Sequence, residues 1–133
     1  MADSKVNDVL SVLAITVIID QHIRTPELTE FKTQAEGLAI LCCPDLTQER
    51  AKAWFDENEP HILDSMESRG RNTVILKAIT AIKDEMIREN LYDAMIAISI
   101  SDKEYHKQES DLVRSAAVIW GFTRPPFKVV TTA

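Results

Sequence analysis

The sequence has few of the residues that break helices. Only 3 of its 133 residues are glycine and 5 are proline. Alanine, leucine, isoleucine, glutamate and lysine are abundant, which argues against a turn-rich all-β fold and favours helices. A chain of this length can bury a hydrophobic core without disulfide or metal support. We therefore expect an all-α fold in one domain.

Cysteine and long apolar runs are also scarce. The 2 cysteines, Cys42 and Cys43, are adjacent and cannot tie distant segments together. No stretch reaches the roughly 18 to 20 apolar residues that a membrane span needs. The first five residues, Met-Ala-Asp-Ser-Lys, lack the apolar core of a signal peptide. These features predict a cytoplasmic protein without a membrane span.

Positive charge is in deficit. Lysine and arginine number 15 against 21 aspartates and glutamates, for a net charge of −6. Nucleic acids and anionic membranes are therefore not expected as partners, because both require basic surface. There is no glycine-rich phosphate loop, and His22, His61 and His106 are not spaced as a zinc site. The acidic excess suits cation binding, but it also suits simple solubility.

Residues 6–19 are apolar on every helical face, a pattern typical of a helix buried in a bundle. The β-branched residues between Val12 and Ile19 would also suit a central strand. A helix is favoured because the pattern continues upstream through Asn7 and Asp8 and no hairpin turn follows.

The remaining helices are predicted from start and stop signals. Thr25-Pro26-Glu27 opens one helix and Pro44 ends it. Asp45 with Gln48 resembles a capping box for the next, and Pro60 predicts a kink or break near Asn58. A loop is expected at 68–72 and a polar interruption at 88–90. Apolar residues at helical spacing predict helices from Val74 to Met86 and from Leu91 to Ile98. The last helix is expected from Leu112 to Trp120, capped by Gly121.

These patterns predict a compact bundle of six to seven helices. Pro125 and Pro126 exclude a further helix, so we expect a single helical domain over 1–124 and an extended tail over 125–133. Trp54 and Phe55 lie at core positions of their helix rather than forming a stacking platform.

One chemical pattern occurs twice. Asp20 follows an apolar helical run, and Glu27 comes seven residues later at the start of the next helix. Asp102 and Glu109 repeat that spacing between the last two helical patterns. An aspartate at a helix C-terminus is repelled by the terminal carbonyls, and a hard cation would relieve this repulsion. Carboxylates and carbonyls are the oxygen ligands that calcium and magnesium prefer, so these four residues are the candidate metal ligands, with zinc less favoured.

The same residues have a simpler explanation. Glu27 and Glu109 would stabilise a helix N-terminus without any metal, and Ser101 with Glu104 matches a capping box. In this alternative the acidic connections only cap helices, and the protein is an interaction module whose docking surface lies elsewhere. A third hypothesis, a small hydrolase built around His61 or Cys43, has no marked catalytic set in the sequence.

The two acidic stretches resemble the paired helix-turn-helix signature of the TerB-like tellurite-resistance family. The segment from Ser99 to Glu109, the ending from Ala117 to Phe122, and the segment from Asp20 to Glu27 carry the likeness. It implies an all-α domain over roughly residues 6–122 with pseudo-two-fold related helix pairs. It also implies a bacterial, non-enzymatic, cation-binding role in stress response, with another stress-response protein as a partner.

This chain departs from the family pattern beside each aspartate. Where the family has glycine directly after the aspartate, this chain has Gln21 in the first copy and Lys103 in the second. Where the family has a small polar residue three positions before the glutamate, this chain has Arg24 and His106. Glycine would let the backbone turn closely around a ligand. The ammonium of Lys103 would instead compete for the position of a cation beside Asp102.

Overall fold

The computed structural model describes residues 2–19, 25–42, 46–100 and 107–121. Those residues form six α-helices and no strand, so the all-α prediction is confirmed. The helices are α1 (Ala2–Ile18), α2 (Thr25–Cys42), α3 (Gln48–Arg69), α4 (Arg71–Thr80), α5 (Glu85–Ser99) and α6 (Lys107–Trp120).

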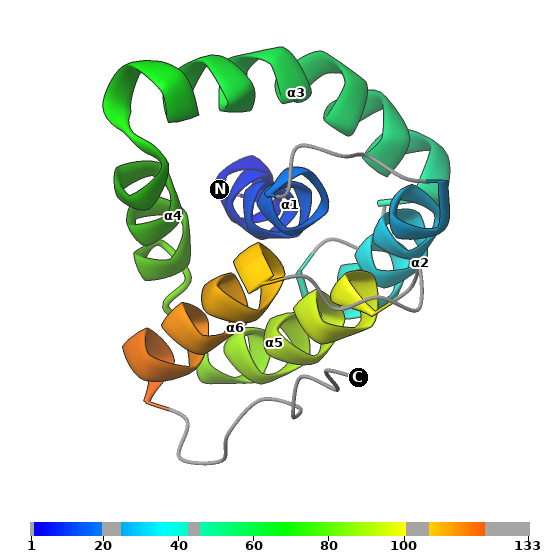
Figure 1. The fold of residues 1–133 in the computed structure, drawn as a ribbon. Helices are drawn as coiled ribbons and strands as arrows, with labels where there is room; N and C mark the ends of the chain where they lie inside the picture. The colour runs from blue at the N-terminus through cyan, green and yellow to red at the C-terminus, as the bar shows by residue number, and fades with distance from the viewer. Residues whose placement is uncertain (1, 20–24, 43–45, 101–106, 122–133) are drawn as a thin grey trace.

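Helix α1 is the centre of the bundle. Figure 1 shows it nearly end-on, with the other five helices around it, and it packs against α2, α3, α4 and α5. Every residue from Val12 to Ile19 is buried. The hydroxyl of Thr16, which is buried among them, donates to the carbonyl of Val12 at 2.9 Å. The helix prediction for this run is therefore confirmed, and the strand alternative is wrong because neighbours cover the helix on every side.

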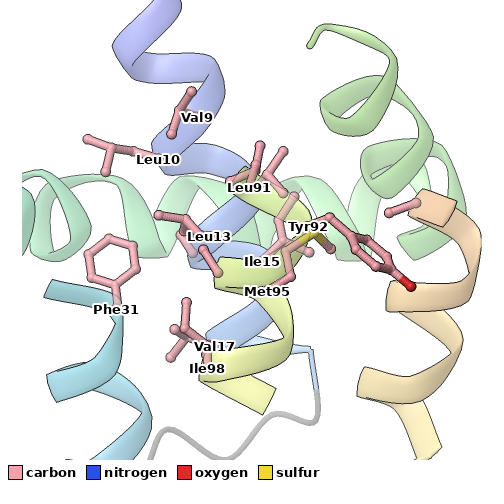
Figure 2. Packing of buried hydrophobic residues seen from close by; sticks show 14 of the residues in the cluster. Val9, Leu10, Leu13, Ile15, Val17, Phe31, Leu91, Tyr92, Met95 and Ile98 are labelled. Carbon is pink, nitrogen blue, oxygen red and sulfur yellow. The ribbon is translucent and has the colours of Figure 1, made fainter. Parts of the chain in front are cut away.

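The hydrophobic core extends from α1 into every other helix. Figure 2 shows Leu13 of α1 between Phe31 of α2 and Met95 of α5. The rings of Phe31 and Phe55 meet edge to face, with centroids 5.2 Å apart, and join α2 to α3. Trp54 is only half-buried, and its indole N–H donates to Asn7 Oδ1 at 2.8 Å. The predicted core position is confirmed for Phe55 and holds in part for Trp54.

The sequence predicts a kink or a break near Asn58. Helix α3 continues through Pro60, so the break is wrong, and the kink stays a prediction. Proline removes one backbone hydrogen bond, normally accepted by the carbonyl four residues earlier. That carbonyl belongs to Asp56, and both Asp56 and Pro60 are exposed to solvent, so water can take the place of the missing donor. The side chain of Asn58 donates to the carbonyl of Trp54 at 2.9 Å and reinforces the same turn.

The predicted loop at 68–72 is also wrong. Only Gly70 separates α3 from α4, and its φ of 93° lies in a region that L side chains rarely adopt. Glycine has no Cβ to obstruct this conformation, so a single residue turns the chain. Gly121 after α6 likewise has a positive φ of 78°, as predicted for a helix-ending glycine.

Two helix starts differ from the prediction. The third helix begins after Thr47, whose hydroxyl accepts from the N–H of Arg50 at 3.2 Å, so Asp45 is not its cap. The fifth begins after Asp84 and runs through 88–90 without a break. Asp84 Oδ1 accepts from the N–H groups of Met86 and Ile87 at 2.9 and 3.1 Å. These side-chain caps fix the starts, and Met86 lies on the exposed face rather than in a core stripe.

Replacing Asp84 with alanine is expected to lower the free energy of unfolding by about 1 kcal/mol, because two N–H groups at the start of α5 lose their acceptor. Urea denaturation measures the change. Asp93→Ala is the matched control, since Asp93 is an exposed aspartate inside the same helix, where alanine has the higher helix propensity. Equal losses in the two variants would contradict the capping role.

The predicted tail lies outside the described residues, which end at residue 121. The boundary between a domain at 1–124 and a tail at 125–133 therefore stays a prediction.

Candidate functional site

The predicted cation ligands lie on the α1–α2 and α5–α6 connections. Glu27 is the third residue of α2 and Glu109 the third of α6, so both occupy the first turn of a helix, as predicted. Asp20 and Asp102 lie outside the described residues, as do the side chains of the two glutamates. Whether the four carboxylates meet stays a prediction.

Helices α1 and α5 lead into these two connections. Figure 2 shows the labelled residues descending in chain order on both, from Leu10 to Val17 on α1 and from Leu91 to Ile98 on α5. The two helices also pack against each other. Figure 1, however, shows α1 nearly end-on and α5 lengthwise, so the two helices cross rather than run parallel.

A hollow of about 400 Å³ with mixed polar and apolar walls lies between the end of α1, α4 and α6. Arg71, Asp111 and Ser115 contribute polar side chains to it, and Ile19 forms part of its apolar wall. In the sequence Ile19 precedes Asp20, and Asp111 follows Glu109 by two residues. The hollow is therefore lined by described residues close in sequence to two of the predicted ligands.

The described part of the chain brings no three His, Cys, Asp or Glu side chains together in an arrangement that could hold a metal. The sequence predicts that the acidic run of α3, Glu57, Glu59, Asp64 and Glu67, is a solvated helix face. Glu57, Asp64 and Glu67 are exposed and Glu59 is half-buried, so the prediction is confirmed for three of the four residues.

A second cavity, of about 280 Å³, lies between α1, the C-terminal half of α3, and α4. Each helix contributes one stripe at helical spacing. Ile15 forms the buried base, and Ile62, Val74 and Ala78 form half-buried walls. Apolar walls with a few polar groups are typical of small-molecule sites.

Four polar residues of the types found in hydrolase active sites also line this cavity: Asp8, Ser11, His61 and Ser65. A nucleophile and its base need to lie within hydrogen-bond reach of each other. Among the hydrogen bonds of the described residues, none joins any two of these four side chains. His61 is also exposed at the rim. The arrangement is not that of an assembled catalytic triad.

Arg69 from the end of α3 and Lys77 from α4 carry positive charge into the lining of the same cavity. Both side chains are exposed, and neither forms an ion pair with another described residue. Other cations of the chain do have partners: Lys52 pairs with Asp56, and Arg88 Nε donates to the carbonyl of Ile82 at 2.7 Å. The cavity therefore combines an apolar floor with two cations that form no ion pair within the described part of the chain.

Small residues at helical spacing are the one trace of this cavity in the sequence. Ser11, Ser65 and Ala78 each lie on the inner side of their helices, and their short side chains leave room where larger ones would fill the space. The one-residue turn at Gly70, predicted as a longer loop, brings Arg69 and Lys77 to one site.

None of the helices among the described residues has both the length and the hydropathy that crossing a membrane requires. This chain matches no family model, no curated protein and no solved structure.

Proposed function

We propose that this protein is a non-enzymatic binding domain that takes up a divalent cation through Asp20, Glu27, Asp102 and Glu109. Calcium or magnesium is the expected ion, because all four ligands are carboxylates. One observation carries the proposal: the same Asp-to-Glu spacing spans two connections whose preceding helices, α1 and α5, pack against each other.

The number of ligands requires both connections. Calcium takes about six to eight oxygen ligands, and one connection offers two carboxylates. Backbone carbonyls at the ends of α1 and α5, together with water, would supply the remaining oxygens. A site shared between both connections is therefore favoured over two separate sites.

The resemblance to the TerB-like family supports a setting in tellurite resistance and bacterial stress response. In that setting the cation would fix the shape of the two acidic connections, and another stress-response protein would recognise them. The described residues contribute no assembled catalytic set to this proposal, which is one of binding rather than of catalysis.

Calorimetric titration with calcium is expected to show binding, and magnesium and zinc serve as comparisons. A ligand present at about 100 times its dissociation constant stabilises the folded state by about 2.7 kcal/mol, so millimolar calcium should raise the melting temperature. Asp20→Asn combined with Asp102→Asn should abolish both effects. The control, Asp64→Asn with Asp93→Asn, removes the same charge from exposed positions on α3 and α5 and should leave binding unchanged.

Two results would count against the proposal. Absence of both heat and thermal stabilisation at millimolar ion would reject cation binding and leave the alternative in which the carboxylates only cap α2 and α6. Unchanged affinity in the Asp20→Asn, Asp102→Asn variant would reject the assigned ligands. Lys103→Gly tests the competing ammonium directly, because its removal should strengthen calcium binding, whereas simple capping predicts no dependence on calcium.

A further inference from the structure

We propose that the cavity between α1, α3 and α4 binds a small carboxylic acid with a short apolar chain. This site is separate from the acidic connections, and the inference does not depend on the cation proposal. It rests on the volume of the cavity, on its apolar floor, and on the two cations that line it.

The volume sets the size of the ligand. An apolar cavity of about 150 Å³ holds benzene. At about 280 Å³, this cavity has room for roughly ten non-hydrogen atoms on the same scale. That space is too small for a diacyl lipid or a nucleotide, and it suits a free acid about the size of octanoate.

The floor of the cavity selects an apolar chain. Ile15 is 2% exposed and closes the base. Ile62 and Val74 face the same space from α3 and α4, and Ala78 leaves room between them. A hydrocarbon chain placed here would leave water and contact three helices at once, and transfer of apolar surface out of water favours binding.

The charges of the lining select the head group. Arg69 and Lys77 contribute two positive charges and Asp8 one negative charge, so these three side chains give the lining a net charge of +1. One carboxylate balances this charge, whereas a phosphate monoester would overcompensate it. The guanidinium of Arg69 can hold a carboxylate through two parallel hydrogen bonds, and the ammonium of Lys77 adds a point charge.

The context of these cations supports a ligand rather than a structural role. The protein as a whole has a net charge of −6, yet both basic side chains lie at this cavity without an ion pair to any described residue. They come from different helices, and the turn at Gly70 brings those helices together. An anion between them would also bridge the end of α3 to α4.

Titration of the full chain with sodium octanoate tests the proposal, followed by calorimetry and by amide NMR shifts. The dissociation constant is expected to lie at about 0.1–1 mM, within the range for ligands of this size. The shifted amides should include Ser11, Ser65 and Ala78. Acetate, which lacks the chain, and octylamine, which reverses the charge, should bind at least about tenfold more weakly.

Arg69→Gln combined with Lys77→Gln should weaken octanoate binding at least about tenfold, because hydrogen bonds to a charged group are lost. Both residues are exposed, so the variant should keep its fold, and its melting curve verifies this. The matched control, Lys83→Gln with Arg114→Gln, removes the same charge from exposed positions outside the cavity and should bind as the native chain does. Ala78→Leu, which fills the cavity, should also lose binding.

Three results would overturn the proposal. The first is no binding of octanoate at millimolar concentration. The second is equal loss of binding in the cavity variant and in the control variant. The third is a set of shifted amides confined to residues outside α1, α3 and α4. The Asp20→Asn, Asp102→Asn variant should bind octanoate normally, so the outcome of this test is independent of the cation test.

Discussion

Phe31→Ala is expected to lower the free energy of unfolding by about 3–5 kcal/mol, the cost typical of removing a large aromatic side chain from a packed core. Phe31 has no exposed surface, and its ring meets that of Phe55 at an interplanar angle of 62°. The residue lies between α1 and α3, so the cavity left behind would have three helices as walls. Small domains are stable by only about 5–15 kcal/mol, so this loss is a large fraction of the total.

Urea denaturation measures this loss, and a double-mutant cycle separates its parts. Phe31→Leu and Phe55→Leu retain much of the apolar volume but remove the ring contact, whose coupling is expected to be about 0.5–1.5 kcal/mol. Val118→Ala is the control for an apolar residue that contributes little, because Val118 is 79% exposed. A loss in Phe31→Ala no larger than in Val118→Ala would contradict the packing described here.

Trp120→Ala is the second large effect expected, at about 3–5 kcal/mol. Trp120 is 7% exposed at the end of α6, and its indole N–H donates to the carbonyl of Ile79 at 3.0 Å. This contact joins α6 to α4 across 41 positions of sequence. Its loss should loosen the whole of α6, which hydrogen exchange would report as faster exchange of the amides in that helix.

Trp120→Phe separates the hydrogen bond from the packing. The carbonyl of Ile79 also accepts from the N–H of Ile82 at 3.2 Å, so it keeps a partner when the indole is removed. The expected loss is therefore about 1 kcal/mol plus the cost of the smaller ring, well below that of alanine. Trp54→Phe provides the comparison, because the bond from Trp54 to Asn7 is exposed and should contribute less. An equal loss at both positions would argue against the tertiary role of Trp120.

The sequence predicted the helical class and the central helix because these depend on local composition and on periodicity. Residues 6–19 are apolar on every face, and a helix of that kind is stable only when others surround it. The boundaries were predicted less well, because single side chains decide them. Asp84 and Thr47 cap their helices through side-chain hydrogen bonds to one or two backbone N–H groups. The spacing of apolar residues does not predict such hydrogen bonds.

Pro60 and Gly70 show why the helix boundaries in the middle of the chain were predicted incorrectly. Proline was expected to kink or break the helix, yet α3 continues through Pro60, which is exposed, as is Asp56, the residue whose carbonyl loses its donor. Glycine in a polar stretch suggested a loop, yet one residue with positive φ completes the turn. Both outcomes depend on exposure and backbone angle, which only the folded chain defines.

The two candidate sites differ in how far the sequence could predict them. The acidic connections could be proposed from the sequence because the same Asp-to-Glu spacing occurs in it twice. The cavity could not, because Arg69, Lys77 and Ile15 are ordinary residues that come from three separate helices. Their significance arises only when the fold brings them to one place.

The burial of α1 also has a consequence before the protein is folded. From Val9 to Ile19 the chain has no charged residue, no proline and no glycine, and most of these residues are β-branched or leucine. Such a segment is prone to cross-β association whenever it is unprotected. Helix α5, one of its main covers, comes much later in the chain, so a growing polypeptide exposes this segment before α5 can shield it. Chaperone binding during synthesis and dilute refolding conditions would both protect the native yield by keeping such segments apart.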